Sequence, residues 1–149
     1  MQAYDERLWP PLWLWIAGWL FALSLSVSFY AALGPVWGLL ALLVPGGLVT
    51  AGLISAAARV QVSDGQLFAG PAHIGVEFLG PAEALDAGAA RAVRGPESDP
   101  AGFHLIRGWV PRGVRARVVD PDDPTPYWFV ASRHPDRLAA AIEAARSSV

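Results

Sequence analysis

The sequence predicts an α+β membrane protein, in which a hairpin of two transmembrane helices is followed by a small antiparallel β-rich domain that ends in an amphipathic helix. Three observations predict this fold class. No Asp, Glu, Lys, Arg or His occurs between Arg7 and Arg59. After Arg59, short runs alternate apolar with polar residues, which is the period of a half-buried strand. The last run spaces its apolar residues by three and four, which is the period of a helix.

The charge-free segment is long enough for two crossings of a membrane. A bilayer core of about 30 Å takes roughly 20 residues of helix per crossing. We therefore expect a transmembrane hairpin over residues 10–58, with helices over about 10–32 and 36–57. Gly34-Pro35 ends one helix with glycine and opens the next with proline, which is the preferred order. Pro45 is expected to kink the second helix, because proline removes a backbone hydrogen bond.

Small residues recur at four-residue spacing on both predicted helices. Such positions let two helix backbones approach closely in a membrane. We expect them to form the interface between the two helices. They are Gly18, Ala22 and Ser26 on the first helix, and Gly47, Ala51 and Ser55 on the second.

Tryptophan is concentrated at the start of the first helix. The indole ring favours the headgroup level of a bilayer, so Trp9 and Trp13 are expected to lie at the membrane interface. Trp15 and Trp19 are expected to lie deeper. Packing against the second helix is one interpretation of these two residues, and a groove for lipid tails or a partner helix is the other.

The orientation follows from the arginines that flank the hairpin. Arg7 and Arg59 lie at its outer ends, whereas the turn between the helices carries no charge. Because cytoplasmic loops carry the excess of Lys and Arg, we expect both termini on the cytoplasmic side of the plasma (inner) membrane, with residues 1–9 as a cytoplasmic N-terminus. A cleaved signal peptide is disfavoured, because the leader is acidic and its apolar stretch exceeds the usual 7–15 residues.

Residues 59–149 are expected to form one cytoplasmic domain with six short strands in a single antiparallel sheet. Asp64-Gly65 between two apolar runs predicts a tight hairpin turn. Pro81 at the head of an alanine-rich segment predicts a helix over 81–93. The other expected elements are strands over 73–79, 103–109, 114–120 and 127–132, and a helix over 135–146 that covers the sheet.

Several segments of the chain resemble those of a known family. They are Tyr4-Asp-Glu-Arg-Leu-Trp-Pro-Pro, Arg59-Val-Gln-Val-Ser-Asp-Gly-Gln-Leu, Trp109-Val-Pro, and the run from Asp120-Pro-Asp-Asp-Pro-Thr-Pro-Tyr-Trp to Arg137-Leu-Ala. The chain is similar to an actinobacterial membrane-protein family described as a domain of unknown function. This resemblance implies an actinobacterial inner-membrane protein and supplies no catalytic residues. The strand order and the segment Ser132-Arg-His-Pro-Asp-Arg-Leu also resemble bacterial domains of the pleckstrin-homology (PH) type.

Residues that carry chemistry are scarce. The chain has no cysteine, and His73, His104 and His134 have no metal-ligand spacing. No Walker A loop, nucleophile elbow, dinucleotide fingerprint or zinc-protease motif is present. We therefore predict no catalytic residue, no metal and no cofactor. The net charge of -2 also disfavours nucleic-acid binding, which needs a basic surface.

One concentration of charge supports a binding hypothesis. Arg107, Arg112, Arg115 and Arg117 flank Trp109 with no acid among them. Basic residues near an anionic leaflet are attracted to it by about 1 kcal/mol each, so these five residues are candidates for binding anionic lipid headgroups or a partner. The alternative interpretation is a solvated face paired with acids.

The sequence thus predicts a non-enzymatic binding or assembly module that lies against the lipid bilayer. One alternative is an accessory subunit of a membrane transporter or envelope enzyme, which binds that protein through the kinked helix and the tryptophan groove. The other is an enzyme acting on a lipid headgroup, with His104 or His134 as the base.

Overall fold

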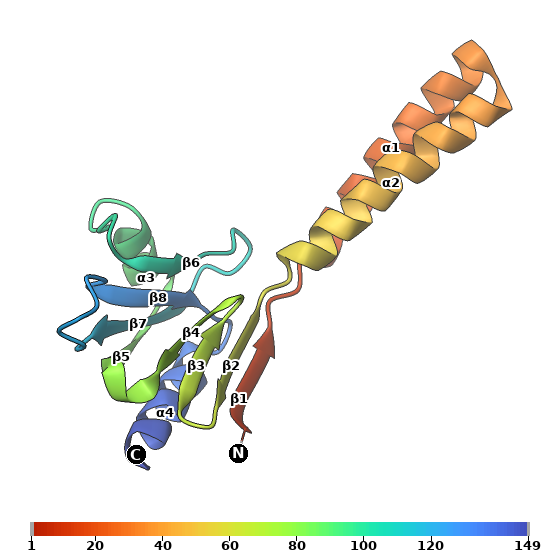
Figure 1. The fold of residues 1–149 in the computed structure, drawn as a ribbon. Coiled ribbons are helices and arrows are strands. Elements are labelled where there is room, and N and C mark those ends of the chain that lie inside the picture. Colours follow the sequence, from red (N-terminus) through yellow and green to blue (C-terminus); the bar gives the residue numbers. More distant parts are fainter. Residues whose placement is uncertain (1, 149) are drawn as a thin grey trace. The chain divides into compact units, whose positions relative to one another are not determined.

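The computed structural model describes residues 2–148. It divides into two compact units (Figure 1). One unit is the helical hairpin, Trp9–Ala57. The other combines the residues up to Leu8 with those from Ala58 onward, and we call it the β unit.

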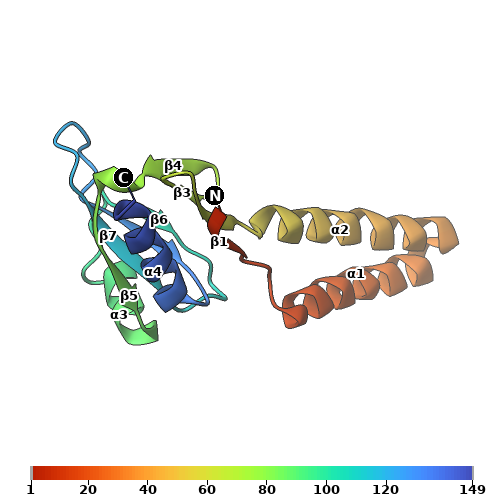
Figure 2. The ribbon, with the colours of Figure 1, turned by 90° about the horizontal axis from the view of Figure 1, so that it is seen from below.

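The hairpin consists of two antiparallel helices of equal length (Figure 2). Helix α1 spans Leu12–Leu33 and helix α2 spans Pro35–Ala56, each with 22 residues. Gly34 links them with a φ of 94°, a left-handed conformation that favours glycine. Its N–H donates to the carbonyl of Tyr30 at 2.9 Å, which closes the first helix. The helix bounds lie within two residues of those expected.

The small residues predicted for α1 do face α2. Ala22 is fully buried, a Cβ on Gly18 would collide with Val49, and the Ser26 hydroxyl donates to the Gly38 carbonyl at 2.8 Å.

The small-residue prediction for α2 was wrong. Ala51 and Ser55 are exposed, and nothing lies within 4 Å of a Cβ built on Gly47. Gly46 faces α1 instead, because a Cβ there would lie 2.9 Å from the Trp19 ring. The Trp19 ring therefore packs against Gly46 and not against Gly47.

The first sheet of the β unit, sheet A, is an antiparallel meander in the order β1-β2-β3-β4. Its strands β2 and β3 are joined by Asp64 and Gly65, whose φ values of 50° and 73° are those of the predicted tight turn. Strand β1 was not expected from the sequence. Instead of a tail, the N-terminal segment is an edge strand paired with β2. The strands are β1 (Gln2–Arg7), β2 (Arg59–Ser63), β3 (Gln66–Ala69) and β4 (Ala72–Gly75).

The second sheet, sheet B, has the strand order β5-β7-β8-β6. Strands β6 and β8 are parallel, so the prediction of a single antiparallel sheet of six strands was wrong. The chain reaches sheet B through a short 3-10 helix, Val76–Phe78, which interrupts the strand expected over 73–79. The strands are β5 (Leu79–Leu85), β6 (Phe103–Leu105), β7 (Gly113–Val118) and β8 (Tyr127–Ala131).

The helix expected over 81–93 begins later than predicted. Pro81 lies in β5, where the pairing with β7 shifts register between Leu79 and Ala82. Helix α3 spans Ala87–Arg94 and starts where Asp86 accepts the Ala89 N–H at 2.8 Å. Pairing with β7 therefore overrides the helix propensity of the first half of the segment.

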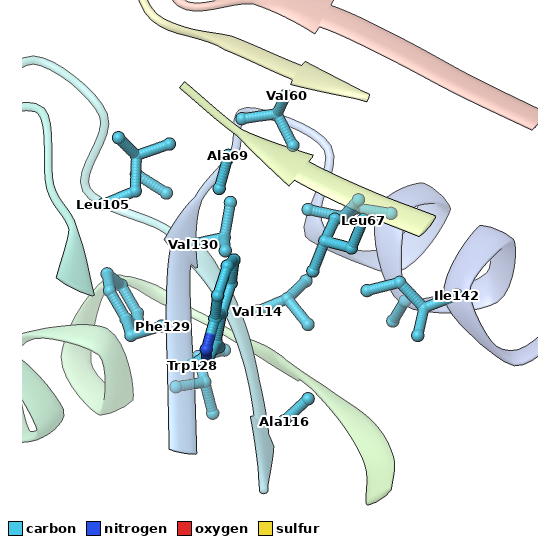
Figure 3. Packing of buried hydrophobic residues seen from close by; sticks show 14 of the residues in the cluster. Val60, Leu67, Ala69, Leu105, Val114, Ala116, Trp128, Phe129, Val130 and Ile142 are labelled. Atoms are coloured by element: carbon cyan, nitrogen blue, oxygen red, sulfur yellow. The ribbon is translucent and has the colours of Figure 1, made fainter. Parts of the chain in front are cut away.

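The two sheets face each other across one hydrophobic core (Figure 3). Helix α4, Pro135–Arg146, buries Leu138 and Ile142 in this core, as its apolar stripe predicted. The core side chains shown in the figure include Val60, Leu67 and Ala69 from sheet A, and Val114, Ala116, Trp128 and Val130 from sheet B.

Candidate functional site

The N-terminal strand is fixed to the rest of the β unit by a buried carboxylate. The Glu6 side chain is only 9% exposed. It accepts hydrogen bonds from the Tyr4 hydroxyl at 2.6 Å, from the Ser132 hydroxyl at 2.6 Å and from the Arg133 backbone N–H at 3.0 Å. Burial, followed by the hydrogen bond to Glu6, raises the pKa of Tyr4 well above its usual range. These contacts join β1 to the segment that opens α4.

The two connections to the hairpin leave the β unit side by side. The Leu8 N–H donates to the Ala58 carbonyl at 2.8 Å, and Arg7 lies opposite Arg59 in the β1–β2 register. Arg59 also forms a two-bond ion pair with Asp5, at 2.6 and 2.8 Å. The chain therefore enters and leaves the hairpin at neighbouring positions.

A loop from β6 to β7 reaches this exit point, and we call residues 106–112 the hairpin-proximal loop. The indole N–H of Trp109 donates to the Leu8 carbonyl at 3.2 Å, so half-buried Trp109 anchors the loop there. Ile106 remains 39% exposed, and the Arg107 guanidinium donates to its carbonyl at 2.7 Å. The loop thus carries an exposed apolar residue next to a basic one, and its Trp109 is bonded to Leu8 of the same unit.

The fold separates the four arginines that are close in sequence. Arg107 lies in the hairpin-proximal loop, and Arg112 is exposed where the loop meets β7. Arg115 and Arg117 lie farther along β7, on the sheet face opposite buried Val114 and Ala116. The candidates therefore occupy two places: Arg107, Trp109 and Arg112 in the loop, and Arg115 with Arg117 on the outer face of sheet B.

The outer face of sheet B carries two adjoining hollows, which we call the outer-face hollows. One has a volume of about 410 Å³ and is lined by Pro81, Glu83, Arg115 and Arg117. The other, of about 320 Å³, is lined by Arg115, Arg117, Pro126 and Tyr127. Arg115 donates to Glu83 at 2.8 Å, across the β5–β7 register.

A model described as "Protein of unknown function (DUF3093)" matches residues 3–142. The chain belongs to the DUF3093 family. The matched region of this DUF3093 protein runs from β1 through the hairpin to α4. No curated protein and no solved structure matches the chain.

Both helices of the DUF3093 hairpin are long and apolar enough to cross a membrane, with mean hydropathies of 1.8 and 2.0. In the most apolar 18-residue stretch of each helix, only 6% of the residues are buried inside the structure. Leu12 and Leu48 are 73% and 70% exposed. The predicted interface residues Trp9 and Trp13 are 42% and 63% exposed. Within residues 2–148, most of the apolar side chains of the hairpin therefore have no protein cover.

The histidines proposed as bases in the DUF3093 chain do not occupy the outer-face hollows. Nδ1 of His104 lies 3.0 Å from the Gly102 carbonyl, and Nε2 lies 3.0 Å from the Tyr127 hydroxyl. Because a carbonyl can only accept, Nδ1 carries the proton, and Nε2 accepts from Tyr127 in the neutral ring. His134 has a largely exposed ring, 3.9 Å from Glu6. Within residues 2–148, no group of three His, Cys, Asp or Glu is placed to hold a metal.

Proposed function

We propose that this DUF3093 chain is an integral membrane protein with two crossings, and that its β unit is a non-enzymatic binding module held against the lipid headgroups. One observation carries the proposal. Two 22-residue apolar helices lie uncovered between Leu8 and Ala58, which are hydrogen-bonded neighbours in the β unit. A chain that crosses twice must return to the side from which it started, and this pairing meets that condition.

The position of β1 argues against a removable leader. Cleavage after α1 would remove fully buried Leu8, together with Tyr4 and Glu6. The buried hydroxyl of Ser132 would then lose the carboxylate to which it donates. Burying an unpaired polar group is costly, so a cleaved chain would form a weakened β unit. This favours an uncleaved first helix.

The side of the membrane follows from the arginines. Arg7 and Arg59 flank the hairpin, and the turn at Gly34 has no charge, so the β unit and both termini lie on the cytoplasmic side of the plasma membrane. We also propose that the chain is of actinobacterial origin and that its β unit is similar to PH-type domains. Two sheets and a C-terminal helix support the likeness to PH-type domains, whereas the parallel β6–β8 pair is a departure from the expected antiparallel sheet.

The hairpin-proximal loop is the natural contact with the headgroups. It is tied to Leu8, and exposed Ile106 beside Arg107 combines an apolar side chain with a cation. Such pairs suit the boundary between acyl chains and an anionic leaflet. Trp9 and Trp13, at the start of the hairpin, are of the residue type that favours the headgroup level.

A direct experiment is alkaline carbonate extraction of native membranes, followed by intact-mass measurement of the recovered chain. The proposal predicts that the protein stays in the membrane pellet and keeps its first helix. Release into the supernatant would contradict the two crossings. Recovery of a chain that lacks its first helix would contradict the uncleaved N-terminus.

A second candidate is an accessory subunit that binds a transporter or envelope enzyme through the hairpin. The observation in its favour is an apolar hollow of about 380 Å³ on the helices, lined by Ile16, Trp19, Leu20, Leu23 and Leu42. Purification in mild detergent tests it. A stoichiometric protein partner that is lost when Leu20 is replaced by Ala, and kept when exposed Leu48 is replaced instead, would support this function.

A further inference from the structure

The outer-face hollows share two guanidinium groups, which have no part in anchoring the chain to a membrane. The alternation of side chains along β7 places both on the same side of the strand. Arg115 lies opposite Glu83 on one neighbouring strand, and Arg117 lies opposite Tyr127 on the other. Paired strands therefore fix where both cations emerge.

The two arginines have donors to spare. Among residues 2–148, no hydrogen bond or ion pair of the exposed Arg117 side chain is found. Arg115 uses one of its five N–H donors on Glu83, and both partners of that pair are partly exposed, at 36% and 57%. Exposed pairs of this kind are weak. An incoming anion can therefore compete with Glu83 for Arg115.

The walls beside the arginines are rigid. Tyr127 accepts the Asp99 N–H at 3.0 Å and its hydroxyl meets His104 at 3.0 Å, so its ring is held in place. Pro81 and Pro126 form the remaining walls. A planar or apolar group fits against such surfaces, and each hollow has the volume of a site for a small molecule.

We propose that the outer-face hollows bind a phosphate monoester. Arg117 and Arg115 bind the phosphate oxygens, for which the planar guanidinium fork is suited, and the organic group packs on the Tyr127 ring. A soluble ester and a lipid such as phosphatidic acid share this chemistry. Gly113 is the end of β7 that meets the hairpin-proximal loop. Arg117 lies four residues farther along the strand, which is a distance of roughly 13 Å at 3.3 Å per residue.

The test is calorimetric titration of phenyl phosphate into the full-length protein in nanodiscs of uncharged (zwitterionic) lipid. Arg117→Gln is expected to weaken binding at least tenfold, while Arg91→Gln, the same charge change at an exposed position of α3 outside the hollows, leaves it unchanged. Glu83→Gln frees Arg115 and is expected to tighten binding several-fold. Glu97→Gln, the same change on an exposed loop outside the hollows, is the matched control.

Three results would overturn the proposal. They are no heat of binding with the unsubstituted protein at millimolar phenyl phosphate, equal losses from Arg117→Gln and Arg91→Gln, and equal gains from Glu83→Gln and Glu97→Gln. Thermal melts of each variant confirm that the β unit is folded. Given binding, displacement of phenyl phosphate by phosphatidic acid in the nanodiscs identifies a lipid source. Retention of phenyl phosphate identifies a soluble ester.

Discussion

Replacing Glu6 with Ala is expected to destabilise the β unit strongly, although the residue lies six positions from the N-terminus. The carboxylate accepts three hydrogen bonds, two of them from the hydroxyls of Tyr4 and Ser132. Hydrogen bonds to charged groups contribute roughly 1.5–3 kcal/mol each. The two hydroxyls lie 3.0 Å apart and can bond each other in the variant, which recovers part of the loss. We expect a net loss of about 3–5 kcal/mol.

The assay is thermal unfolding of the full-length protein in detergent. A loss of this size lowers the melting temperature of a domain of about 100 residues by roughly 12 °C or more. Glu97→Ala is the matched control, because this exposed carboxylate lies on a loop, and its effect is expected within about 0.5 kcal/mol. A Glu6→Ala melt equal to that of Glu97→Ala would refute the integration of β1 into the fold.

Three further predictions address single contacts. Gly46→Ala places a Cβ 2.9 Å from the Trp19 ring, and we expect it to destabilise the hairpin by about 1–3 kcal/mol in SDS titrations. Gly47→Ala is expected to be neutral, because nothing lies within 4 Å of a Cβ at that position. Trp109→Phe removes the hydrogen bond to Leu8 and is expected to cost about 1 kcal/mol in denaturant unfolding. Because the pKa of Tyr4 is raised on folding, its contribution is complete below pH 10.0 and is lost as pH rises above that value, and Tyr4→Phe is expected to reduce this alkaline slope.

The elements with strong local signals were predictable from the sequence. The absence of charge between Arg7 and Arg59 predicted both helices, and Asp64-Gly65 predicted the first turn of the β unit. The apolar stripe around Leu138 predicted α4. Each of these signals depends on residues close together in the chain.

The features that depend on distant partners were not predictable. Strand β1 contains three charged residues, Asp5, Glu6 and Arg7. Glu6 can be buried because the Ser132 hydroxyl, 126 residues away in the sequence, donates a hydrogen bond to its carboxylate. Pro81 and the alanines after it indicated a helix, but pairing with β7 holds them in a strand.

The candidate binding site was predictable only in part. Spacing placed Arg115 and Arg117 on one face, and the structure has them on one face of β7. Arg107 lies apart from them in a loop that is anchored by the hydrogen bond from Trp109 to Leu8. These two residues are 101 positions apart in the sequence. Tyr127 also joins the hollow from another strand, so sequence proximity to the arginines did not indicate it.

A chain that crosses the membrane twice returns to the side of its N-terminus. Because the chain has no cysteine, single variants can be labelled without background. Val36→Cys, at the hairpin turn, and Ser98→Cys, on an exposed loop of the β unit, are treated with a membrane-impermeant maleimide before and after cells are made permeable. Two crossings with a cytoplasmic β unit are expected to give labelling of position 36 in intact cells and of position 98 only after permeabilisation. Labelling of both positions from the same side would show that the chain does not cross in this way.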